Sequence, residues 1–166
     1  MAEDEIQERD QLLAALKYQR GSVLAIVDGL AEEKWHTSVV PSGWTVAGVV
    51  EHLGHAERHW FQQVVNGHAV ELPWDEGRPD YDPNAPFICD RRSSDVRAYY
   101  EEQCRRSDEV LTGVSLSDRP KGRHRNTEVT NVREVVLHMI EETAAHSGHL
   151  EIARELLDGQ TGLGLR

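Results

Sequence analysis

Apolar residues recur at helical spacing in four long segments of the chain. The segments span residues 3–30, 45–66, 93–113 and 131–158. In the first, the apolar positions fall near a seven-residue repeat: Leu12, Leu16, Val23, Ile26 and Leu30. Such spacing puts one apolar stripe along a helix, which a neighbouring element must cover. The pattern therefore predicts four long amphipathic helices.

Capping residues stand at the ends of these segments. Thr45 is suited to cap the second helix, and Ser93 or Ser94 the third. Asn131 with Glu134 three residues later resembles a capping box that opens the fourth. Two glycines are suited to end the second and fourth helices: Gly67 and Gly159.

The connections contain no convincing strand. Residues 68–90 contain four prolines and are too broken for regular structure, and loops of this length often cover a site. A second polar loop spans residues 114–129. Four helices without strands predict an all-α four-helix bundle, formed as a single domain over residues 1–166. The long connection between the second and third helices also allows a non-sequential helix order.

The fourth helix carries a stripe of ionisable residues. His138, Glu142, His146 and His149 are spaced by four, four and three, so they share one face. Burying them costs several kcal/mol, of order 2–7 per unpaired polar group, unless they are paired or bind a metal. The second helix offers His52, which stands among apolar residues and is predicted to point inward, whereas we interpret His55 and His59 as exposed.

These residues are candidates for a metal site, but spacing alone does not bring the second and fourth helices together. A single histidine on a half-apolar helix is more often a satisfied core or surface residue than a ligand, so both interpretations stay open at this point. His52, Glu142 and His146 supply two nitrogens and one oxygen, a set that suits zinc, nickel, manganese or ferrous iron. His138 and His149 compete for the same face. In the alternative arrangement Glu142 orients a ligating imidazole, and His149 is the third ligand.

Charge and composition narrow the function. The net charge is −11, which disfavours nucleic-acid binding. One basic stretch, Arg119–Arg125, is interpreted as solvated loop charge in preference to an anion site. Cys89 and Cys104 are too few for a disulfide scaffold. No apolar run approaches the roughly 20 residues that span a membrane and no secretory signal is recognisable, so a cytoplasmic protein is expected.

Two stretches resemble the DinB-like superfamily of proposed metalloenzymes. Residues 42–60 contain Trp44-Thr45, then His52-Leu53, then Glu57-x-x-Trp60, a pattern similar to that of the superfamily's second helix. Residues 138–159 resemble its last helix. The likeness covers nearly the whole chain in helix order, and it is strongest to an actinobacterial branch that includes mycothiol-dependent transferases.

The resemblance implies an up-down-down-up bundle with one metal ligand from the second helix and two, four residues apart, from the last. Those positions are His52, Glu142 and His146. Glu142 stands where many relatives have histidine. The resulting His/Glu/His set resembles that of the mycothiol-dependent maleylpyruvate isomerase relatives. His149 falls where relatives have glutamine, beside the site, and His138 is then structural.

The function implied is a metal-dependent thiol S-transferase or isomerase. In such enzymes a divalent metal, zinc in first place, binds and deprotonates a low-molecular-weight thiol, which then reacts with a small electrophile. Two alternatives remain open: a non-catalytic metal-binding stress or interaction module, and a hydrolase that uses metal-bound water. A homodimer is compatible with a bundle of this size.

Overall fold

The computed structural model describes residues 3–69, 71–75, 82, 84–125 and 127–162. These residues form a bundle of helices and contain no strand, only an isolated bridge between His124 and Thr127. The elements, in chain order, are α1 Glu3–Val27, α2 Glu32–Trp35, α3 Val46–Glu57, η1 Arg58–Val65, α4 Ser93–Thr112 and α5 Val132–Asp158. The all-α prediction is confirmed.

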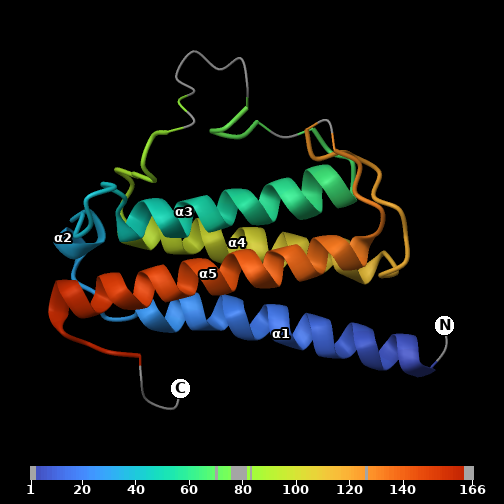
Figure 1. Ribbon diagram of the computed structural model, residues 1–166, viewed down its shortest axis with the longest axis horizontal. Coiled ribbons are helices and arrows are strands. Elements are labelled where there is room, and N and C mark those ends of the chain that lie inside the picture. Colours follow the sequence, from blue (N-terminus) through green and yellow to red (C-terminus); the bar gives the residue numbers. More distant parts are fainter. Residues whose placement is uncertain (1–2, 70, 76–81, 83, 126, 163–166) are drawn as a thin grey trace.

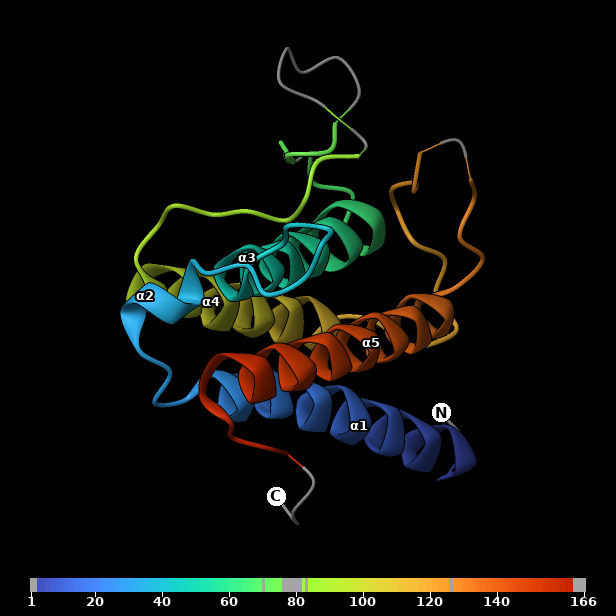
Figure 2. The same ribbon diagram turned by 60° about the vertical axis from the view of Figure 1, so that its left-hand side comes forward.

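The long helices run in the directions that the resemblance implied. α1 and α5 run one way, and α3 and α4 run the other way, which is the up-down-down-up order (Figure 1). Figure 2 shows the bundle turned, with the described parts of the 66–92 connection and of the loop before α5 both on the α3 side. α5 packs against α3, so side chains from the two helices can contact one another.

Helix ends follow the sequence signals with one exception. The Thr45 side chain accepts a hydrogen bond from the Gly48 amide at 3.1 Å, and that of Asn131 accepts one from the Glu134 amide at 3.0 Å. The prediction that Ser93 or Ser94 caps α4 is wrong. Glu32 of the short helix α2 instead accepts hydrogen bonds from the amide and hydroxyl of Ser93, because a carboxylate satisfies these free donors well.

The second predicted helix is not one regular α-helix. It is α-helical to Glu57 and then continues as the π-helix η1, whose wider turns shift the helical register. His59, near the start of η1, is buried, with only 6% of its surface exposed. The interpretation of His59 as an exposed residue is therefore wrong.

A buried ion pair holds the junction of α3 and η1 against α1. Arg20 donates from Nε and Nη2 to the two carboxylate oxygens of Glu57, both at 2.7 Å. Glu57 is fully buried, and Arg20 also donates to the exposed Asp108 on α4. Such a paired fork satisfies both buried charges and fixes the spacing of three helices. Among the described residues, no helix is long and apolar enough to cross a membrane.

Candidate metal centre

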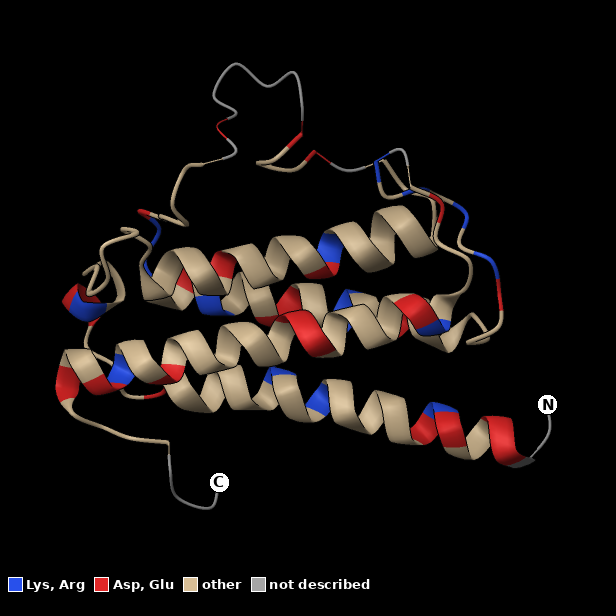
Figure 3. Ribbon diagram, viewed as in Figure 1, with Lys and Arg blue, Asp and Glu red and all other residues tan. Residues whose placement is uncertain are grey.

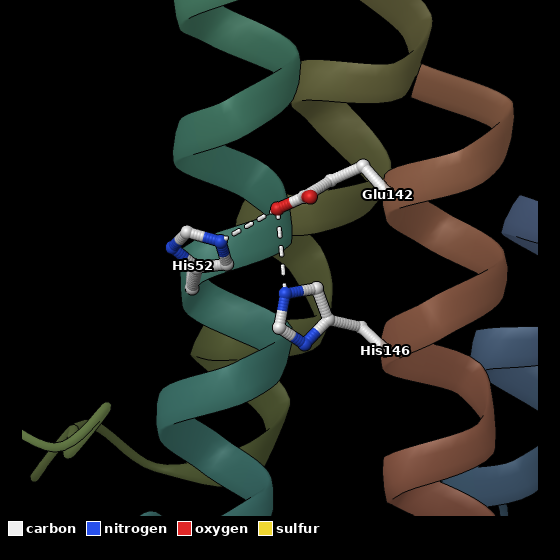
Figure 4. A group of neighbouring side chains, drawn as sticks. All are labelled: His52, Glu142 and His146. Atoms are coloured by element: carbon white, nitrogen blue, oxygen red, sulfur yellow. Dashed lines mark hydrogen bonds and ion pairs between the residues drawn. The ribbon is translucent and has the colours of Figure 1, made fainter. Parts of the chain in front are cut away.

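Three side chains from two helices converge between α3 and α5. α3 supplies His52, and α5 supplies Glu142 and His146, which lie one turn apart and so face the same way. One carboxylate oxygen, Glu142 Oε1, lies 3.0 Å from His52 Nε2 and 3.3 Å from His146 Nε2 (Figure 4). One donor atom from each residue lies within 4.8 Å of the other two. Two imidazole nitrogens and one carboxylate oxygen in this arrangement can hold a divalent transition metal.

The electrostatics of the centre favour a cation. Hydrogen bonds from His146 and then His52 hold the pKa of Glu142 far below its usual range, so the carboxylate is ionised at neutral pH. The side chains of His52, Glu142 and His146 are 16%, 26% and 13% exposed. A negative charge that is largely removed from water, with two nitrogens turned toward it, is well placed to bind a positive ion.

The connection before α4 holds the His52 ring in place. The Phe87 ring stacks on His52, with centroids 4.1 Å apart and planes at 14°. The Thr45 amide donates to the Phe87 carbonyl at 3.0 Å, and Gly48 lets that carbonyl lie against α3, because a Cβ at Gly48 would come 1.9 Å from the oxygen. The lack of a side chain at Gly48 is therefore a requirement of the site.

A cavity of about 300 Å³ opens beside His52. Its walls come from α3, from both described ends of the 66–92 connection and from the loop before α5: Gly48, Glu51, His52, His55, Pro73, Trp74, Asp82, Ala85, Pro86, Phe87, Ile88 and Arg125. The expected cover over the site is thus present in the described part of the connection. A small molecule in this cavity would lie beside His52.

Comparison with known proteins places the chain in a family. Residues 11–159 match the model of the mycothiol-S-transferase family. The chain belongs to this family. The match confirms the DinB-like assignment made from the sequence motifs.

A solved structure, described as a conserved protein of a locus from Enterococcus faecalis, has the same fold. The TM-score is 0.65 at 16% identity, over 91% of this chain and 97% of that chain. At this identity the likeness concerns the fold alone. No protein of curated function matches the chain.

The other two histidines of the α5 stripe lie outside the cluster formed by His52, Glu142 and His146. His149 is exposed, and its Nδ1 lies 3.5 Å from Nδ1 of His146, on the ring edge that faces away from Glu142. His138 lies against the ring of Trp60, with centroids 4.4 Å apart. The structure thus brings together His52, Glu142 and His146 and leaves His138 and His149 at its margins.

Sequence reasoning missed three histidine contacts in the part of the α3–η1 helix that carries His55 and His59. Nε2 of His59 lies 2.8 Å from Nδ1 of His124, and Nδ1 of His59 bonds Gln63 Oε1 at 2.8 Å. His55 Nδ1 lies 2.8 Å from the Tyr99 hydroxyl, and burial lowers the pKa of His55 to about 4. The three-and-four spacing of these histidines along the second helix was the available signal, but the partners come from other elements.

Proposed function

We propose that the protein is a metal-dependent S-transferase that joins a low-molecular-weight thiol of the mycothiol type to small electrophiles. His52, Glu142 and His146 are the ligands of a divalent metal, zinc in first place, and His149 supports His146 from behind. The observation that carries the proposal is the convergence of these three donor atoms within 4.8 Å beside a cavity, in a chain of the mycothiol-S-transferase family.

Each residue around the centre has a separate role in the proposed reaction. A bound metal would lower the pKa of the thiol cosubstrate and favour its thiolate. The Glu142 carboxylate offsets part of the positive charge, and the ring of Phe87 keeps His52 in the orientation that presents Nε2. Trp74 and Phe87 line the cavity and would shield a thiolate bound there from water.

The protein's own thiols are unsuited to be the nucleophile. Burial raises the pKa of Cys89 to about 11 and raises that of Cys104 further. Both side chains therefore stay protonated at neutral pH, and a protonated thiol is a poor nucleophile. This supports an external thiol as the attacking group.

The experiment is metal analysis and turnover of matched histidine variants. Protein purified without a metal-affinity tag should contain about one divalent metal per chain and conjugate mycothiol to monochlorobimane. His52→Ala should lose both, whereas His68→Ala, which changes an exposed histidine, should lose neither. Circular dichroism would verify that both variants fold.

The other outcomes reject the proposal in distinct ways. Absence of any bound metal, with none taken up on addition, rules out the metal centre. Metal without thiol conjugation favours the non-catalytic module. Turnover of esters or amides that does not need a thiol favours the hydrolase.

A further inference from the structure

A second cavity adjoins the first. It measures about 460 Å³ and is lined by residues of η1, the 66–92 connection and the loop before α5: His59, Gln63, Trp74, Asp75, Arg123, His124, Arg125 and Thr127. Trp74 and Arg125 line both cavities. The second cavity therefore lies next to the one beside His52, with these two side chains at their common border.

The basic residues of the loop before α5 fall into two groups, those with a bonding partner and those without one among the described residues. Arg119 forms an ion pair with Glu128, and Lys121 Nζ donates to Asn66 Oδ1 at 3.1 Å. Arg123 and Arg125 are exposed residues that line the second cavity, and no ion pair or hydrogen bond joins either guanidinium to another residue that the structure describes. Figure 3 shows Lys and Arg gathered along this loop beside the end of η1.

The backbone of this loop is fixed to η1. The amides of Lys121 and Gly122 donate to the carbonyls of Val65 and Val64, at 3.1 and 2.8 Å. Gly122 is required there, because a Cβ would lie 2.2 Å from the Gln63 carbonyl oxygen. The loop therefore presents its side chains from a defined position, as a binding site needs.

Arg125 stands in a tight turn. Its φ of 52° is the left-handed value that hairpin-type turns have at this position, and the turn is closed by a hydrogen bond from the Thr127 amide to the His124 carbonyl at 2.9 Å. Next to it, the His124 ring stacks on Trp60, with centroids 4.5 Å apart, and bonds His59. These contacts fix the position of the loop beside the second cavity.

The charge balance of the second cavity favours an anion. Two arginines and one carboxylate line the cavity, and that carboxylate, Asp75, already accepts a hydrogen bond from the Leu72 amide at 2.8 Å. Burial lowers the pKa values of His59 and His124, so both are neutral hydrogen-bonding groups at neutral pH. A local excess of positive charge in a chain of net charge −11 is a specific feature of this loop.

We propose that Arg123 and Arg125 bind the carboxylate of the electrophilic substrate, so that this S-transferase prefers acidic electrophiles. The inference rests on the proposed function for the reaction and on the second cavity for the specificity. Mycothiol carries no ionised acid group, so the anionic partner of the two arginines is the electrophile. A guanidinium binds a carboxylate through paired hydrogen bonds and gives orientation as well as affinity.

The reaction on such a substrate is a simple displacement. With 4-chloro-3-nitrobenzoate, the thiolate sulfur attacks the ring carbon that bears chlorine, a carbon–sulfur bond forms, and chloride leaves with the electron pair of the broken carbon–chlorine bond. The thiol proton passes to solvent. The carboxylate takes no part in bond making, so its binding can be tested apart from the chemistry.

The first test is binding without a thiol. Isothermal titration of the metal-loaded protein should show 4-chloro-3-nitrobenzoate binding at least about 10-fold more tightly than 4-chloro-3-nitrobenzamide, a difference of about 1.4 kcal/mol. The double variant Arg123→Gln with Arg125→Gln should lose this preference. Arg119→Gln is the matched control, because it removes one charge from the same loop at a paired position and should keep the preference.

Three results would overturn the inference: no saturable binding of the benzoate, equal affinity for benzoate and benzamide, or a preference that survives the double variant. Steady-state kinetics then distinguish failure of this inference from failure of the proposed function. The double variant should raise the KM for the benzoate about 10-fold and leave the KM for mycothiol unchanged. A binding preference without any thiol conjugation would reject the S-transferase and retain the anion site.

Discussion

Two histidine clusters lie along the α3–η1 helix, and they differ in how their contacts are arranged. In the first, His52 and His146 both turn Nε2 toward one oxygen of Glu142. In the second, the contacts run in a chain from Gln63 to His59 to His124 and use opposite edges of the His59 ring. Donor atoms converge on one point in the first cluster only.

The difference shows why a pair of buried imidazoles is not in itself a metal site. In the first cluster an ionised carboxylate completes the donor set, and it would need compensation if no cation were bound. In the second, a neutral amide and two neutral rings satisfy one another. The charge and direction of the third group decide which cluster can hold a cation.

The largest expected effect comes from the ion pair that separates the two clusters on this helix. Glu57→Gln leaves the buried Arg20 with only the exposed Asp108, and breaking a buried pair costs about 3–5 kcal/mol. Urea denaturation should show this loss in the free energy of unfolding, whereas Asp108→Asn should cost less than about 1 kcal/mol. The folded Glu57→Gln protein should still bind one metal; loss of metal from folded protein would show that the pair belongs to the site.

The next effect tests convergence directly. Glu142→Gln keeps the shape of the side chain and removes its charge, so metal affinity should fall by about 100-fold or more, beyond the 10–100-fold that supporting residues produce. Gln63→Glu adds a carboxylate to the second cluster and should create no second metal site, because its contact lies on the far edge of the His59 ring.

Competition with a chromophoric chelator would measure the metal affinity of Glu142→Gln and of Gln63→Glu. A third variant, His149→Gln, tests the alternative set of three histidine ligands. A supporting role predicts at most a 10–100-fold loss for His149→Gln. If His149→Gln loses as much affinity as His52→Ala while Glu142→Gln retains its metal, the three-histidine site is correct.

The sequence predicted the first cluster better than the second for a physical reason. His52, Glu142 and His146 stand on regular α-helices, where spacing in the chain determines which face a residue occupies. The family resemblance supplied the pairing of α3 with α5, which spacing alone does not contain. With that pairing given, knowing which face of each helix carries these residues was sufficient to predict the first cluster.

The second cluster depends on features that periodicity does not encode. His59 stands seven residues after His52, so helical spacing places both on one side of the helix, but spacing does not supply the partner of His59. His124 stands in a loop, positioned by a glycine whose close contact with Gln63 lies 59 residues away in the chain. The pairing of Arg20 with Glu57 is likewise a contact between distant residues, so it was not visible in the pattern of either helix.

The smallest effect concerns the pH at which each cluster loses stability. Burial lowers the pKa of His59 below its ordinary value of 6.5, so just below pH 6.5 the unfolded chain binds more protons than the folded chain, and stability falls as pH falls. Asp75 opposes this shift, whereas Arg125 and His138 add to it. The pKa of Glu142 is depressed from 4.5, so its contribution is present above pH 4.5 and is lost only at lower pH.

The two pKa shifts, one of an imidazole and one of a carboxyl group, therefore affect different parts of the pH profile. In metal-free protein, His59→Gln should reduce the fall in urea midpoint between pH 7 and pH 5.5, and Glu142→Gln should reduce the loss of stability below pH 4.5. His68→Gln, at an exposed position, controls for the loss of an imidazole as such. If His59→Gln retains the full fall, His59 is protonated without cost in the folded state, and the chain of neutral contacts with Gln63 and His124 does not describe the second cluster in solution.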